Sequence, residues 1–126
     1  MARLKRSLKI AIALLFTGVI LSSCGVGGAV ADARTSCTYV HKALALQKQS
    51  GRPGLSTNQQ NTLKNDAEGE LLKGTQSAAN ATSIDGSWNA LQTTINEAER
   101  VPLQDLVASL TRICQVADSA SPYLGG

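Results

Sequence analysis

The chain has 126 residues, which fits one small domain, and a formal net charge of +3. Four of its twelve Lys and Arg residues lie in the first nine positions, so residues 24–126 carry eight cations against nine acids. That part has no clustered basic patch and only three aromatic side chains to stack on bases, which argues against nucleic-acid binding.

The start of the chain is typical of an export signal. Four cations within the first nine residues precede twelve uncharged, mostly apolar residues (10–21), and two serines follow at positions 22 and 23. A basic start, a short apolar stretch and a small-residue exit together predict a signal peptide over residues 1–23.

The four residues Leu21, Ser22, Ser23 and Cys24 resemble the lipobox of bacterial lipoproteins. In that family a diacylglycerol is attached to the cysteine thiol, and signal peptidase II cleaves just before it. The resemblance implies lipidation at Cys24 and anchoring to the outer face of the cell membrane. The Ala-rich remainder is similar in texture to small uncharacterised lipoproteins of actinobacteria.

An uncleaved signal anchor is the alternative to lipidation. Residues 10–31 form a run of 22 residues without a charge, long enough to cross a bilayer as a helix. The two serines and the four glycines between positions 18 and 28 weaken it as a spanning segment, which favours the lipobox. Both interpretations keep the basic start in the cytoplasm.

The cysteine count predicts one disulfide. With Cys24 lipidated, Cys37 and Cys114 remain as a single pair in an oxidising compartment, where a disulfide is the usual state. Closing a loop of about 78 residues stabilises a fold by roughly 4 to 5 kcal/mol in the chain-entropy model. We therefore expect a stabilising disulfide between these two residues.

The first predicted elements are a tether and a helix. Residues 24–31 are small and unpatterned, which predicts a lipidated flexible tether. Apolar side chains at helical spacing predict a first helix over residues 32–50. The following segment, residues 50–54, holds two glycines and a proline and predicts the end of that helix.

The second predicted helix is long. Ser56 and Gln59 have the spacing of a capping box at its start. One narrow apolar seam continues from Leu63 to Ala81, which predicts a single helix across Gly69 and Gly74, although each glycine costs about 1 kcal/mol relative to alanine.

Two further helices follow. The segment 80–86 is rich in turn-forming residues, and Asp85 or Ser87 is placed to cap a third helix with apolar residues from Trp88 to Ala98. Pro102 is predicted as the first residue of a fourth helix, whose apolar stripe runs to Ala117. Residues 121–126 are predicted to form a loose tail.

The sequence as a whole predicts an all-α fold, a small antiparallel bundle of about four helices over residues 32–120. In such a bundle the first and fourth helices are neighbours. Both Cys37 and Cys114 lie on apolar stripes that face the same core, so the predicted disulfide agrees with the predicted topology.

A few residues invite a chemical interpretation. His41, the only histidine, lies four residues after Cys37, but an oxidised Cys37 is neither a nucleophile nor a metal ligand, so we expect a structural histidine. Asp66 and Glu70 share a helix face, but the spacings of Lys64 with Glu68 and of Glu70 with Lys73 predict ordinary surface pairs. Trp88 lies on an apolar stripe and is predicted to belong to the core. We expect no catalytic residue, cofactor or metal.

These patterns predict a lipid-anchored, extracytoplasmic helical module that binds another component of the cell envelope, most simply a protein, without catalysis. Motifs of serine hydrolases and thiol oxidoreductases are missing from the sequence. The alternatives are a carrier of a small apolar ligand, which an apolar cavity larger than about 300 Å³ would favour, a signal-anchored membrane protein of the same topology, and an enzyme that uses His41.

Overall fold

The computed structural model describes residues 26–123, and the regular secondary structure in this range is helical. The predicted signal peptide (1–23), the lipidation site Cys24 and residues 124–126 lie outside the described residues. The helices are α2 (Val26–Ser50), α3 (Thr57–Lys73), α4 (Thr75–Ile84), α5 (Asn89–Glu97) and α6 (Val107–Asp118), with short 3-10 helices η2 (Gly86–Trp88) and η3 (Leu103–Asp105).

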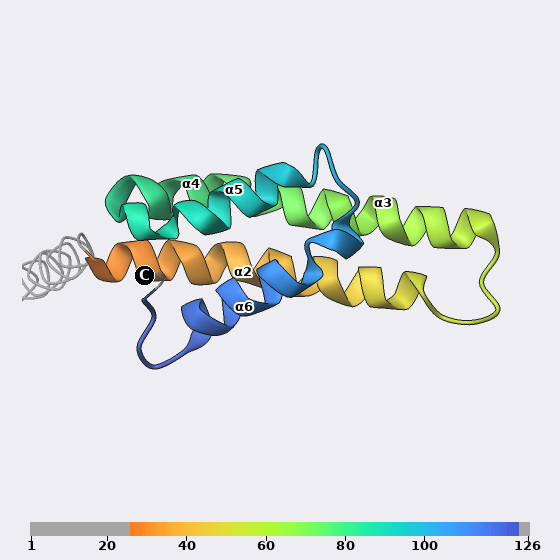
Figure 1. The fold of residues 1–126 in the computed structure, drawn as a ribbon, viewed down its shortest axis with the longest axis horizontal. Helices are drawn as coiled ribbons and strands as arrows, with labels where there is room; N and C mark the ends of the chain where they lie inside the picture. The colour runs from red at the N-terminus through yellow and green to blue at the C-terminus, as the bar shows by residue number, and fades with distance from the viewer. Residues whose placement is uncertain (1–25, 124–126) are drawn as a thin grey trace, which may run out of the picture.

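The helices pack as two antiparallel hairpins, which confirms the predicted all-α bundle. Figure 1 shows α3 and α4 running back along α2, the longest of the described helices, while α5 and α6 form a second, shorter hairpin. α2 contacts α3, α4 and α6. The predicted neighbourhood of the first and last helices is therefore confirmed.

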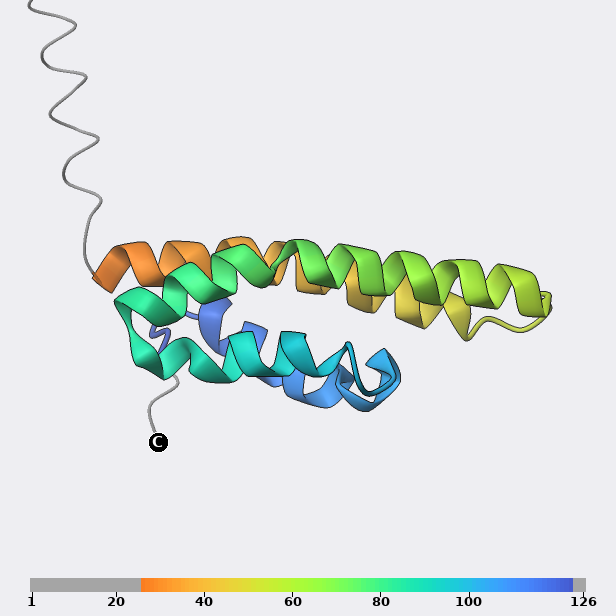
Figure 2. The same cartoon turned by 90° about the horizontal axis from the view of Figure 1, so that it is seen from above.

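The two hairpins differ in length. α2 has 25 residues and is therefore about 37 Å long at roughly 1.5 Å per residue, whereas α5 has 9 residues and α6 has 12. Figure 2 shows that the second hairpin ends well before the tip of the first. A cleft between η3 and the side chains of Gln47 and Lys64 marks where this cover ends. We call the projecting part, residues 47–64, the hairpin arm.

The core combines small and large side chains. Small side chains lie along α2 and along α3 and α4, which lets these helices approach closely, and α5 and α6 fill the opposite side with larger groups. The fully buried members are Ala29, Ala33, Cys37, Val40 and Ala43 of α2, Ala67, Leu71, Ala78 and Ala81 of α3 and α4, and Trp88, Leu91, Ile95, Leu110, Ile113, Cys114 and Ala117 of the remaining elements. The predicted apolar stripes are confirmed.

The flexible tether predicted over residues 24–31 is wrong from Val26 onward, because α2 begins there. Ala29 and Ala33 have no exposed surface and continue the buried stripe of Cys37 toward the start of the chain. Burial on the neighbouring helices thus outweighs the low helix propensity of the glycines in this segment. The bundle starts six residues earlier than predicted.

The prediction of one continuous second helix is also wrong, because the helix is interrupted at Gly74, between α3 and α4. The Ser36 hydroxyl of α2 donates a buried hydrogen bond of 2.9 Å to the Gly74 carbonyl. A Cβ atom at Gly74 would lie 3.0 Å from the Ser36 Oγ and 3.1 Å from the Ser36 carbonyl oxygen. A larger residue would require α2 to shift by a few tenths of an ångström.

Local signals fix the helix ends. The capping box is confirmed: the Gln59 amide donates to the Ser56 Oγ at 3.1 Å, and the Ser56 amide donates to the Gln59 Oε1 at 2.9 Å. In the loop before it, Gly54 adopts a φ of +86°, which glycine tolerates best.

Pro102 does not begin the last helix as predicted. It precedes η3, and α6 starts at Val107.

Candidate functional site

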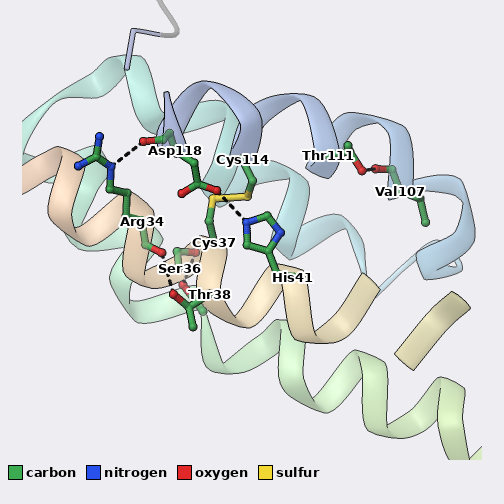
Figure 3. The surroundings of a disulfide bond; sticks show 11 residues. Arg34, Ser36, Cys37, Thr38, His41, Val107, Thr111, Cys114 and Asp118 are labelled. Carbon is green, nitrogen blue, oxygen red and sulfur yellow. Dashed lines mark hydrogen bonds and ion pairs between the residues drawn. A yellow bond between two sulfur atoms is a disulfide. The ribbon is translucent and has the colours of Figure 1, made fainter. Parts of the chain in front are cut away.

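The predicted disulfide between Cys37 and Cys114 is present and joins α2 to α6 (Figure 3). The two Cα atoms are 5.5 Å apart, and neither cysteine is exposed to solvent. The stripes that carry the two residues face each other because α2 and α6 are direct neighbours. The bond closes a large loop and holds the last helix against the first.

Arg34 reinforces this connection at the end of α6. Its Nε donates to the Ala117 carbonyl at 2.8 Å, and one of its terminal nitrogens donates to the Ser119 carbonyl at 3.1 Å. The last carbonyl groups of a helix have no partner within the helix and carry partial negative charge. A cation supplied by α2 therefore satisfies them and stabilises the end of α6.

His41 lies on the other side of the disulfide and contacts Asp118. The distance between His41 Nε2 and Asp118 Oδ2 is 2.8 Å, and 56% and 45% of the two side chains are exposed. Figure 3 shows this pair beside the sulfur–sulfur bond. The sequence predicts a structural histidine at position 41 but does not reveal its partner, because 77 residues separate the two.

The cluster around the disulfide is built to hold helices together. The sulfur of Cys37 is bonded to Cys114, so His41 has no thiolate beside it to activate. Within residues 26–123, no group of three potential ligand side chains is placed to hold a metal ion. The arrangement therefore acts as a mechanical link between α2 and α6.

The acidic residues of the other helices form surface pairs. Lys73 Nζ donates to Glu70 Oε1 at 2.7 Å, as predicted for this spacing. The hydrogen bond from Lys73 lowers the pKa of Glu70, and the same bond raises the pKa of Lys73. Glu97 pairs with Arg100 in the same way. Trp88 is 1% exposed, so its predicted place in the core is confirmed.

Charge is distributed unevenly along the folded chain. Residues 33–65 contain five Lys and Arg and no acid, whereas residues 66–126 contain eight acids and three Lys and Arg. The hairpin arm belongs to the first segment. Its Lys48, Arg52 and Lys64 are exposed, and amide side chains make up much of the surface between them.

The arm also carries a basic hollow. Lys48 and Arg52 line an open depression of about 440 Å³ together with Gln49 and Pro53 at the end of α2. Carboxylates are missing from its lining. An exposed surface with cations and amide groups, and without acids, is complementary to an anionic partner.

An apolar cavity suitable for a carrier was not found among the described residues. Four hollows lie at the surface of the described residues, and at least three polar or charged side chains line each of them. The carrier of a small apolar ligand therefore stays a prediction.

No protein-family model, curated protein or solved structure matches this chain. None of the described helices has both the length and the apolar character needed to cross a membrane. The function must therefore be inferred from the surface and from the chemistry of individual residues, because a helical bundle alone does not specify one.

Proposed function

We propose that the protein is a lipid-anchored helical module on the outer face of the cell membrane, where it binds another envelope component without catalysis. The leader and the residues Leu21 to Cys24 support export and lipidation. The disulfide between Cys37 and Cys114 supports an oxidising compartment, because such bonds persist mainly outside the cytosol.

The hairpin arm is the proposed binding surface. The observation that carries this assignment is the acid-free segment 33–65, whose far part projects beyond the second hairpin with Lys48, Arg52 and Lys64 exposed. Exposed charges of one sign steer an oppositely charged partner toward the surface. High salt screens this attraction and weakens it. The proposed partner is therefore an anionic component of the envelope.

The anchor is tested by processing in bacteria. Globomycin blocks signal peptidase II, so treatment should cause the unprocessed chain to accumulate in the membrane fraction. A Cys24→Ser variant is the control, because it should be insensitive to the drug. Normal processing in the presence of globomycin would contradict lipidation, and an uncleaved chain without the drug would favour the signal-anchor alternative.

The binding surface is tested by photo-crosslinking on intact cells. A photoreactive residue at Asn58, exposed on the arm, should capture an anionic partner, whereas the same residue at Asn96, exposed on α5, should not. Capture from Asn58 should fall in the Lys48→Gln/Arg52→Gln variant. Equal capture from the two positions would contradict the assignment.

Loss of charge elsewhere provides the matched control for that variant. Arg100 and Arg112 are exposed cations outside the arm. An Arg100→Gln/Arg112→Gln variant changes the net charge by the same amount, so capture from Asn58 should persist in it. If both variants lose capture equally, the effect depends on overall charge and the arm is not the binding surface.

A further inference from the structure

We infer that the end of the bundle at which α2 begins rests on the lipid bilayer, with Ile84 and Tyr123 in contact with the membrane interface. This inference rests on the proposed lipidation of Cys24. It adds a second interaction surface, at the end of the molecule opposite the hairpin arm, and it commits to a lipid bilayer as the occupant.

The first step follows from the early start of α2. The helix begins at Val26, two positions after Cys24. Two residues of chain span at most about 7 Å. If Cys24 carries the lipid, the start of α2 can lie no farther than this distance from the lipidated residue. The start of α2 must therefore lie at the membrane surface.

The second step identifies what lies beside the start of α2. The hydrogen bond between Ser36 and Gly74 sets the register between α2 and the antiparallel α4. Ile84 follows Gly74 by ten residues and Val26 precedes Ser36 by ten, so each lies about 15 Å from the crossing point at roughly 1.5 Å per residue. Figures 1 and 2 show the turn after α4 at the same end as the start of α2.

The end of the chain reaches the same region. Arg34, two turns into α2, holds the carbonyl groups of Ala117 and Ser119 at the end of α6. The residues after α6 then remain at this end of the long axis in both views. Tyr123 follows Ser119 by only four positions, a span of at most about 14 Å, so it belongs to the same end of the molecule.

The third step is the chemistry of this end. Ile84 is 49% exposed and Tyr123 is 71% exposed, and among the described residues these are the two large hydrophobic side chains with high exposure. Tyrosine is enriched at membrane interfaces, where its ring is buried and its hydroxyl group stays hydrated. Two residues are too few for a stable protein dimer, which needs roughly 1,000 Å² of buried surface, but they suffice to orient a protein that a lipid already holds.

Electrostatic attraction to lipids contributes little at this end. The nearest cation on α2, Arg34, is engaged with the end of α6. The carboxylate of Asp85 accepts a hydrogen bond from the Ser87 amide at 3.0 Å. The contact should therefore form on zwitterionic phosphatidylcholine as readily as on anionic lipid.

The test uses the lipidated full chain in phosphatidylcholine vesicles whose acyl chains carry bromine, which quenches tryptophan fluorescence at short range. Ile84→Trp and Leu55→Trp form a matched pair, one at the proposed contact and one near the tip of the arm. Trp88 is common to both, and its signal is subtracted with the unsubstituted protein. We expect the added fluorescence at position 84 to be mostly lost and that at position 55 to persist.

The outcomes separate the two proposals. Equal quenching at positions 84 and 55, or quenching at 55 alone, would overturn the inference. Protection of position 84 from aqueous iodide without quenching by brominated lipid would point to a protein contact and would also overturn it. Failure of the unsubstituted chain to float with vesicles, to the same degree as Cys24→Ser, would refute the lipid anchor itself.

Discussion

At the scale of single residues, the crossing of α2 over the junction of α3 and α4 depends on the missing side chain of Gly74. The Ser36 hydroxyl donates to the Gly74 carbonyl and lies only 3.0 Å from the place that a Cβ atom would take. Helices that approach this closely gain contacts along their whole length, since Ala33, Ala67 and Ala78 nearby are also small and buried.

We expect Gly74→Ala to lower the free energy of unfolding by about 1 to 3 kcal/mol, because a methyl group must be forced into a filled space. Urea denaturation followed by circular dichroism measures this change. Gly69→Ala is the matched control: this glycine is also helical, a Cβ atom there would meet nothing within 4 Å, and the variant should gain about 0.5 to 1 kcal/mol. Equal effects of the two substitutions would contradict the close-approach explanation.

The contacts of Arg34 and His41 show where prediction from sequence ends at this scale. The Ser56 and Gln59 capping box is local, so its spacing alone predicted it correctly. Arg34 reaches carbonyl groups more than eighty positions away, and His41 reaches Asp118 across the disulfide. No periodicity within one helix encodes such partners, because they depend on how two helices are rotated against each other.

At the scale of elements, the short last helix depends on its links to α2. α6 has twelve residues, which is marginal for an isolated helix. The disulfide, the hydrogen bonds of Arg34 and the pair of His41 with Asp118 all join it to α2. The pair is largely exposed and contributes less than about 1 kcal/mol, so the covalent bond dominates.

We expect the Cys37→Ala/Cys114→Ala variant to lose about 4 to 5 kcal/mol of unfolding free energy, because the loop of about 78 residues is no longer closed in the unfolded chain. Equilibrium unfolding in urea measures the loss. Adding a reductant to the unaltered protein provides an independent comparison should the variant fail to fold. A change in unfolding free energy below about 1 kcal/mol in both experiments would show that packing alone stabilises the fold and that the disulfide contributes little.

Helix boundaries were the least predictable feature of the elements. The apolar stripes were correct because helical periodicity reports which side chains are buried. The start of α2 and the interruption at Gly74 were missed because both depend on contacts between helices: burial of Ala29 and Ala33 in one case, and the approach of Ser36 in the other.

At the scale of the whole molecule, shape and charge are both polarised along one axis. The start of α2, the turn after α4 and the end of the chain lie at one end, and the hairpin arm lies at the other. Lys48 and Arg52 face outward at the arm, while acids outnumber cations over residues 66–126. The proposed anchor and the proposed binding surface are therefore as far apart as the fold allows.

The sequence predicted this arrangement only in part. The bundle and the neighbouring first and last helices followed from four amphipathic segments joined by short loops. The projection of the arm was not predicted, because it depends on how far the shorter hairpin of α5 and α6 extends along the first hairpin. The charge asymmetry is visible in the sequence, but its meaning requires knowing that residues 47–64 project from the bundle.

The unbroken course of α2 gives the protein a fixed reach. A flexible linker of similar length would let the proposed binding surface sample a broad range of distances from the membrane. α2 instead runs as one rod for about 37 Å, from two positions beyond Cys24 to Ser50. With the proposed anchor, this helix would hold the arm at a fixed distance from the membrane, so a partner would be bound at that distance. A few residues inserted within the helix would change both the distance and the direction in which the arm points.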